Sequence, residues 1–314
     1  MAAQGCVAVG HQADARPHHT SRSAHLRQCG ADENQIDQDE LFDCHVNNNQ
    51  EPLMKLHLLT VTILTTTLTG IGMSSALAEE PLRIGISAEP YPPFTYTSSD
   101  GAWTGFEVEL AEALCDAMQR ECEITPTGWS GIIPSLQSGR IDMIMNSMSI
   151  TEARQRVIDF SSPYYFTPGA YVAASDFSDE IPAGLDGKVI GVQSATTNAT
   201  FARRALRDSG VDVRLYDQAE QVNRDLLAGR LDLILADEIA MREFVERDEA
   251  AGFEIKATAP HHDAYGEGVG IGLRKEDDEL IEALNAAIAE INANGTCSSL
   301  SERYFGTDVC ISDE

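Results

Sequence analysis

The sequence predicts an α/β protein made of two similar lobes, and three observations support this prediction. Short apolar runs alternate with amphipathic segments from about residue 82 to residue 293, which is the order expected of strands and helices in an α/β architecture. Residues 136–144 read LQSGRIDMI, and residues 226–234 repeat this pattern as LLAGRLDLI. In each copy a glycine ends a helix, a buried strand follows, and polar side chains come next. Two lobes that present polar strand ends predict a cleft between them.

The first lobe is predicted to begin with a strand at 83–87. A helix starting near Glu107 follows, with apolar residues at helical spacing: Val108, Ala111, Leu114, Cys115 and Met118. We then expect a strand at 122–125, a short helix at 132–137 and a fully buried parallel strand at 139–145. Thr151 is a good N-cap for a further helix that carries Arg154 on its first turn.

The second lobe is predicted to repeat the alternation. Its strands are expected at 189–192, 211–216 and 231–235, its helices at 197–206 and 218–227, and a further helix near Glu238. A C-terminal helix, with Leu280, Leu284, Ile288 and Ile291 at helical spacing, is expected to pack back on the first lobe. The chain would cross between lobes near 167–170 and 266–270, where Gly169, Gly266, Gly268 and Gly270 permit backbone rotation.

The expected organisation is therefore a leader followed by two lobes. Residues 1–53 are polar and without an apolar face, and we interpret them as a non-native or disordered extension. Residues 54–78 have a basic start, an apolar stretch and an Ala76-Leu77-Ala78 end, the layout of a cleaved signal peptide. Residues 82–169 with 270–314 form lobe 1, and residues 170–269 form lobe 2.

Composition excludes some classes of partner. The formal net charge is −28, with acidic residues spread along the chain, so nucleic acid and anionic membranes would be repelled. No tight zinc pattern occurs, although the leader holds His18, His19, Cys29, Cys44 and His45. We expect no metal and no cofactor.

Several short motifs occur in a characteristic order. They are GFEVELA at 105–111, SITEAR at 149–154, FSSPY at 160–164, GKVIGV at 187–192, TT at 196–197, GRLD at 229–232, GLRK at 272–275 and NGT at 294–296. Together they resemble the bacterial extracellular solute-binding proteins of the polar amino acid type, over about residues 82–308. The pattern is most similar to members that bind lysine, arginine and ornithine, histidine, or opines.

The resemblance implies a fold and a function. It implies the two-lobed periplasmic-binding-protein fold (type II), with a two-strand hinge and the ligand in the cleft. It further implies a monomeric periplasmic receptor that binds a free amino acid and docks on the membrane permease of an ATP-driven (ABC) importer. The ligand is expected to be a polar or cationic amino acid, such as arginine, lysine, ornithine or histidine.

One group of residues is predicted to hold the two ends of the amino acid. Arg154 follows a polar strand end, and its guanidinium suits a carboxylate. Asn146, Ser147 and Ser149 could cap the helix at Thr151, but one such residue suffices, so we favour ligand contact. Asp237 could cap the helix at Glu238; in the matching family position an Asp binds the ligand's α-ammonium. Thr196 and Thr197 open a helix whose free N–H groups suit an anion, although Ala195 stands where the family usually has Gly.

A second group is predicted to hold the ligand's side chain. The resemblance places aromatic faces at Tyr91 and Trp129, which would also suit a cation, whereas Phe94 is expected in the core. Glu89 could meet the distal charge or point to solvent.

The cysteines of the mature chain allow two disulfide bonds. Cys115 and Cys122 lie across a short turn between a helix and a strand and match a Cys-x6-Cys of the family. Cys297 and Cys310 are the remaining pair, which the resemblance does not supply.

The main alternative is an enzyme. Periplasmic cyclohexadienyl and arogenate dehydratases share this fold and need a general acid, for which Glu89 or Glu238 could be considered. No Ser–His, Cys–His or metal constellation is present, and His261 and His262 are expected in a solvated loop. We therefore expect no catalytic residues and no enzyme.

Overall fold

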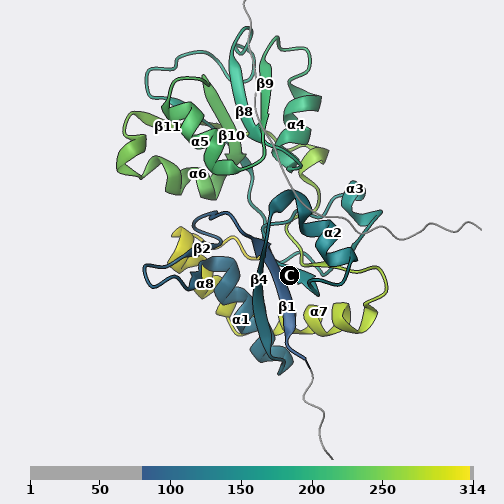
Figure 1. Ribbon diagram of the computed structural model, residues 1–314. Helices are drawn as coiled ribbons and strands as arrows, with labels where there is room; N and C mark the ends of the chain where they lie inside the picture. The colour runs from purple at the N-terminus through teal and green to yellow at the C-terminus, as the bar shows by residue number, and fades with distance from the viewer. Residues whose placement is uncertain (1–79, 312–314) are drawn as a thin grey trace, which may run out of the picture. The chain divides into compact units, whose positions relative to one another are not determined.

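The computed structural model describes residues 80–311. The leader predictions for 1–53 and 54–78 therefore lie outside the described residues. Within 80–311 the chain forms two five-stranded sheets and a short hairpin (Figure 1).

The first sheet has the order β4-β1-β5-β12-β6. Its strands are β1 (Leu82–Ser87), β4 (Cys122–Thr127), β5 (Met143–Ile144), β6 (Asp159–Phe160) and β12 (Gly272–Leu273). Strands β4, β1 and β5 run parallel, and β12 is antiparallel to β5 and β6. The second sheet has the order β11-β7-β10-β8-β9. It consists of β7 (Gly169–Ala174), β8 (Val189–Gln193), β9 (Asp212–Tyr216), β10 (Leu233–Asp237) and β11 (Phe253–Thr258).

The two sheets share one topology. In the second sheet β9, β8 and β10 run parallel, and β7 is antiparallel to β10 and β11. In each sheet, the parallel strand that comes first in the chain (β1 or β8) lies between the other two parallel strands. An antiparallel strand (β12 or β7) then pairs with the last of the three, β5 or β10. The internal repeat accounts for this likeness: Asp142 accepts a hydrogen bond from the N–H of Arg83 (3.0 Å), and Asp232 accepts one from Val189 (2.7 Å). Gly139 and Gly229 both have positive φ, as helix ends that turn into strands require.

Helices cover both faces of each sheet (Figure 1). In the first part they are α1 (Phe106–Met118), α2 (Ile132–Gln137), α3 (Glu152–Gln155), α7 (Asp278–Ala293) and α8 (Thr296–Phe305). In the second part they are α4 (Thr197–Ala205), α5 (Ala219–Leu227) and α6 (Glu238–Val245). The parallel strands are buried on both sides, since Met143 packs with the α1 side and Ile144 with the α2 side. This explains why these strands are continuous apolar runs.

Smaller elements complete the described chain. They are the hairpin β2 (Tyr96–Thr97) and β3 (Trp103–Thr104) and the 3-10 turns η1 (Trp129–Gly131), η2 (Asp248–Ala250) and η3 (Asp263–Tyr265). Phe94 is fully buried, as predicted.

Some predicted elements differ from the structure. The strand expected at 139–145 forms ladder pairs only at Met143–Ile144, because Gly139 and Arg140 still belong to the preceding turn. Strands β7 and β11 and helix α8 were not predicted. His261 is exposed as expected, but His262 is not a solvated loop residue. Its Nδ1 accepts the N–H of Ala264 (3.0 Å), and its ring packs edge-on against Phe201.

Both predicted disulfide bonds are present. Cys115 and Cys122 are bonded with their Cα atoms 6.3 Å apart, and Cys297 and Cys310 with theirs 6.2 Å apart. The first joins the end of α1 to the start of β4. The second joins α8 to a segment that forms an isolated bridge between Cys310 and Tyr165.

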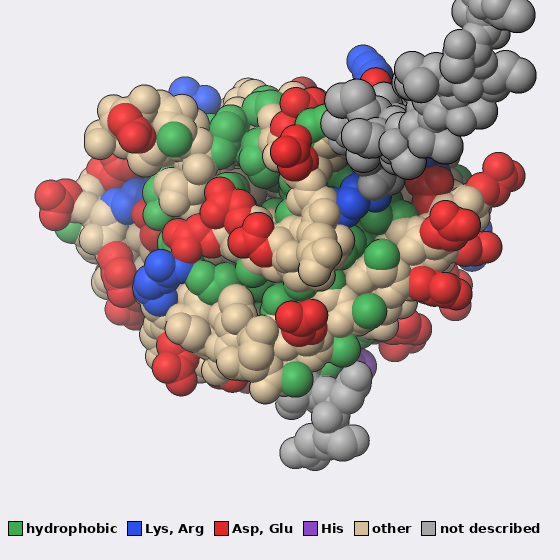
Figure 2. All heavy atoms as spheres, turned by 90° about the horizontal axis from the view of Figure 1, so that it is seen from below, with side chains coloured by type: hydrophobic (Ala, Val, Ile, Leu, Met, Phe, Trp, Pro, Cys, Tyr) green, Lys and Arg blue, Asp and Glu red, His purple; other side chains and the backbone are tan. Residues whose placement is uncertain are grey.

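The surface carries dispersed acidic side chains. Figure 2 shows them distributed over one face of the molecule, with few basic side chains among them. Within residues 80–311, no helix is long and apolar enough to cross a membrane.

Candidate functional site

The candidate site lies at the carboxyl ends of two parallel strands from each sheet. Ser87 ends β1, Asn146 follows β5, Gln193 ends β8 and Asp237 ends β10, and all four line one pocket. Ligands of open α/β sheets bind at such carboxyl ends. The cavity has a volume of about 80 Å³, which is enough for several water molecules or a small ligand.

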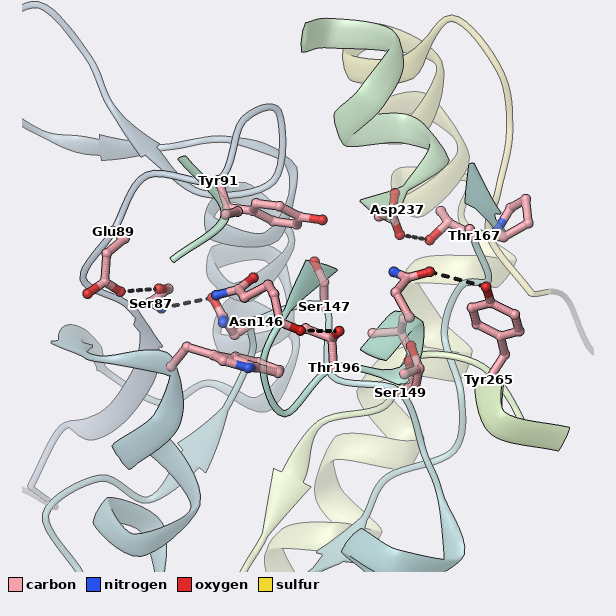
Figure 3. Close-up of a pocket in the computed structure, with 18 of the residues that line it drawn as sticks. Ser87, Glu89, Tyr91, Asn146, Ser147, Ser149, Thr167, Thr196, Asp237 and Tyr265 are labelled. Carbon is pink, nitrogen blue, oxygen red and sulfur yellow. Dashed lines mark hydrogen bonds between the residues drawn. The ribbon is translucent and has the colours of Figure 1, made fainter. Parts of the chain in front are cut away.

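All ten residues predicted for the site line this pocket. They are Glu89, Tyr91, Trp129, Asn146, Ser147, Ser149, Arg154, Thr196, Thr197 and Asp237. Figure 3 shows Glu89 and Asp237 at opposite ends, with the ring of Tyr91 extending from one end toward the other.

Arg154 lies on α3, whose N-cap is Thr151 as predicted. One guanidinium nitrogen donates to the carbonyl oxygen of Ser149 (2.7 Å) and another to that of Ala195 (3.1 Å). The guanidinium carbon lies 5.5 Å from the centre of the Trp129 ring. None of the ion pairs within residues 80–311 includes Arg154. Burial lowers the pKa of Arg154 to about 10, so it remains charged at neutral pH and can pair with an incoming carboxylate.

Asp237 is both a helix cap and a pocket residue. Its Oδ1 accepts from the N–H groups of Ile239 (2.9 Å) and Ala240 (3.4 Å) at the start of α6, and the Thr167 hydroxyl donates to Oδ2 (Figure 3). Burial raises the pKa of Asp237 to about 6, despite these three donors. The carboxylate remains mostly ionised at neutral pH and can accept a hydrogen bond from an ammonium group.

The opposite end of the pocket holds Glu89. Its Oε2 accepts from the hydroxyl of Ser87 (2.8 Å), and its Oε1 accepts from Nε2 of Gln218 (3.2 Å). The Ser87 N–H in turn donates to Oδ1 of Asn146 (2.8 Å), so Asn146 supports this end of the site rather than the helix cap at Thr151. Among the described lining residues the charged ones are Arg154, Asp237 and Glu89, one cation and two anions.

Two turns at the site have unusual backbone angles. Ser147 has φ 50 and Ala195 has φ 60, which non-glycine residues adopt at a cost. The Ser147 N–H donates to buried Glu107 (3.1 Å), which also accepts from the hydroxyl of Tyr165 (2.7 Å). Ala195 thus has the positive φ that the glycine usual in the family adopts without strain. Its carbonyl oxygen accepts a hydrogen bond from Arg154.

The turn at Ala195 opens α4, where Thr196 and Thr197 lie. The Thr196 hydroxyl caps the helix by accepting from the N–H of Ala199 (3.1 Å). Next to it, Oδ1 of Asn198 accepts a hydrogen bond from the hydroxyl of Tyr265 (3.2 Å). Gly169 is needed beside this pair, because a Cβ there would lie 2.5 Å from Asn198 Oδ1 and from the Tyr265 oxygen.

Apart from the Thr167–Asp237 bond, which lies where the chain crosses between the sheets, three hydrogen bonds among the described residues join the two sides of the pocket. Nε1 of Trp129 donates to the carbonyl of Ser194 (3.1 Å), and Arg154 donates to Ala195. The third joins Gln218 to Glu89.

Several lining residues were not predicted. They include Ser87, Thr167, Gln193, Asn198, Ala219 and Tyr265. Ser87 and Gln193 are the last residues of parallel strands, and this position was a usable signal for a place in the ligand site. Asn198 directly follows Thr196 and Thr197 at the start of α4, which was also a usable signal, whereas no comparable signal identifies Tyr265.

The fold and pocket define a two-lobed binding protein for a small zwitterionic solute, with the periplasmic-binding-protein fold predicted above. A model of the bacterial extracellular solute-binding proteins, family 3, matches residues 82–307, and the chain belongs to this family. Curated relatives include the L-arginine-binding protein of Pseudomonas aeruginosa, 38% identical over 76% of this chain and 93% of its own length. The lysine/arginine/ornithine-binding periplasmic protein of Escherichia coli is 35% identical over 82% of this chain and 99% of its own.

Solved structures agree with this assignment. An ancestral arginine-binding protein bound to arginine matches with a TM-score of 0.68 and 33% identity, over 73% of this chain and 100% of its own. A Salmonella typhimurium periplasmic binding protein with high arginine specificity matches with a TM-score of 0.67 and 28% identity, over 72% of this chain and 100% of its own. The named relatives are binding proteins rather than enzymes, so the dehydratase alternative is not favoured.

Proposed function

We propose that this protein is the receptor of an ATP-driven amino acid importer and that its ligand is a cationic amino acid. The observation that carries the proposal is the charge of the pocket. Arg154, Asp237 and Glu89 together complement a carboxylate, an α-ammonium and one further cation. Arginine, lysine and ornithine have this set of charges. The named relatives, which bind L-arginine or lysine, arginine and ornithine, support the same class.

The arrangement of the pocket supports one orientation of the ligand. The carboxylate would bind Arg154 and the N–H groups near Thr196 and Thr197, and the α-ammonium would bind Asp237. The side chain would extend between Tyr91 and Trp129 toward Glu89, at the far end of the pocket. Ser147 and Ser149 would add hydrogen bonds near the carboxylate.

We further propose that 82–169 with 270–314 and 170–269 act as two lobes that close on the ligand. A ligand held by Arg154 on one side and Asp237 on the other favours the closed state, because only that state makes both contacts. The closed monomer would then dock on the membrane permease.

Export across the inner membrane completes the proposal. Residues 54–78 would act as the signal peptide, which is consistent with the extracellular family. The match to the Escherichia coli relative covers 82% of this chain and so extends upstream of residue 80.

Calorimetry on the mature protein tests the ligand class. Arginine should bind more tightly than glutamine, glutamate and citrulline, in which a neutral urea replaces the guanidinium. Glu89→Gln should weaken arginine binding and leave the affinity for citrulline nearly unchanged, because only arginine loses a charge partner. Tighter binding of a neutral or acidic amino acid by the wild type would refute the cationic assignment.

A further inference from the structure

Gln218 reaches across the pocket instead of capping its own helix. It occupies the N-cap position of α5 with extended backbone angles, yet its side chain makes no cap hydrogen bond. N-caps are normally short polar residues such as Ser, Thr, Asp or Asn. The Gln218 Nε2 instead donates to Oε1 of Glu89 (3.2 Å), a residue 129 positions earlier in the chain.

This contact leaves the charge of Glu89 unbalanced. The two groups of the described chain that donate hydrogen bonds to its carboxylate, the Ser87 hydroxyl and the Gln218 amide, are neutral. No ion pair in the described chain includes Glu89. A carboxylate offers about four acceptor positions, so two remain for a cation in the pocket.

The Gln218–Glu89 bond also differs in kind from the other two that cross the pocket. Trp129 and Arg154 donate to backbone carbonyls, near the end that would hold the ligand's carboxylate. Gln218 and Glu89 join two side chains, at the end that would hold the ligand's side chain. Of these three contacts, the Gln218–Glu89 bond is therefore the one that lies where the ligand's distal group would bind.

We propose that Gln218 is a positioning residue for charge recognition. By holding one oxygen of Glu89 from the opposite lobe, it directs the remaining acceptor positions toward the ligand's distal cation once the lobes have approached. The preference for a cationic over a neutral side chain is then set jointly by both lobes. This inference rests on the proposed function.

The test compares arginine with citrulline in calorimetric titrations of the wild type, Gln218→Ala and Gln221→Ala. Gln221 lies on the same helix but, unlike Gln218, makes no side-chain hydrogen bond to a residue lining the described pocket, so its variant should behave as wild type. Gln218→Ala should weaken arginine binding by roughly ten- to a hundredfold, as expected for the loss of one hydrogen bond to a charged group, and should weaken citrulline binding by less than about twofold. In a Glu89→Gln background the same change should have little effect on arginine, because the charge to be oriented is gone.

The outcomes separate the two proposals. Equal losses for arginine and citrulline would show that Gln218 only holds the lobes together and would refute the inference alone. The inference would also be refuted if Gln218→Ala weakened arginine binding in the Glu89→Gln background as much as it does in the wild type. Failure of the wild type to bind any cationic amino acid would refute the proposed function and the inference with it.

Discussion

Replacing Asp237 by Asn should make the unliganded protein more stable while impairing binding. Asn is as good an N-cap as Asp, so the bonds from Ile239 and Ala240 should persist. The new amide nitrogen can donate to the Thr167 hydroxyl, which now donates to the carboxylate. The change therefore removes a charge and preserves the shape of the site.

The pKa of Asp237 sets the size of the effect. Burial raises this pKa from 3.8 to about 6, so the folded protein holds the proton more tightly than the unfolded chain. The contribution of Asp237 to stability is fully present below about pH 4 and is lost as the pH rises through about 6. Two pKa units correspond to roughly 3 kcal/mol, and contact with water in the pocket reduces this to about 1–2 kcal/mol.

Urea unfolding at pH 4 and pH 8 measures this contribution. The variant should exceed the wild type by about 1–2 kcal/mol at pH 8 and match it near pH 4. Its affinity for arginine should fall by about 30-fold or more, because a paired charge in a pocket contributes about 2 kcal/mol or more. Asp232→Asn is the control for binding, since Asp232 accepts from Val189 and lines no part of the pocket. A variant less stable than wild type at pH 8, with unchanged affinity, would refute the reasoning.

Three further predictions concern the same molecule. Arg154→Ala should weaken arginine binding by about 30-fold to a few thousandfold, as expected for a loss of about 2–5 kcal/mol. Arg156 is exposed, so Arg156→Ala should bind arginine normally. A calorimetric affinity of Arg154→Ala within threefold of wild type would contradict the prediction. Wild-type affinity should fall about tenfold from pH 7 to pH 5, because Asp237 becomes protonated below its pKa of about 6, and the Asn variant should show no such fall. Replacing Cys297 and Cys310 by Ser should lower the free energy of unfolding by about 3 kcal/mol through loss of a short-loop cross-link, measured by urea unfolding; an unchanged midpoint would contradict it.

The sequence predicted those elements whose pattern is local. The repeat around Gly139 and Gly229 identified a helix end and a buried strand in each half, and both glycines adopt the expected positive φ. The polar residues after the strands lined the pocket because parallel strand ends share one edge of a sheet. Strand β7 was missed because Thr167, Pro168 and Gly169 read as a crossing, although the strand begins at Gly169 itself.

Other features depend on contacts that no local pattern encodes. Strand β11 lies at a sheet edge, and none of its residues is fully buried. His262 was expected in solvent, but packing on Phe201 gives it a structural role. Gln218 resembled an ordinary helix residue, since its partner Glu89 is distant in the chain.

The backbone acceptors at Ser194 and Ala195 have a consequence for how this protein can change over generations. Trp129 and Arg154 donate to main-chain oxygens, which every residue type supplies. Side-chain substitutions in that turn therefore leave these two acceptors in place. The distal end depends on the side chains of Glu89 and Gln218, which substitution can alter one at a time. Substitutions can thus change the side-chain contacts at one end of the pocket while the backbone contacts at the other end are retained.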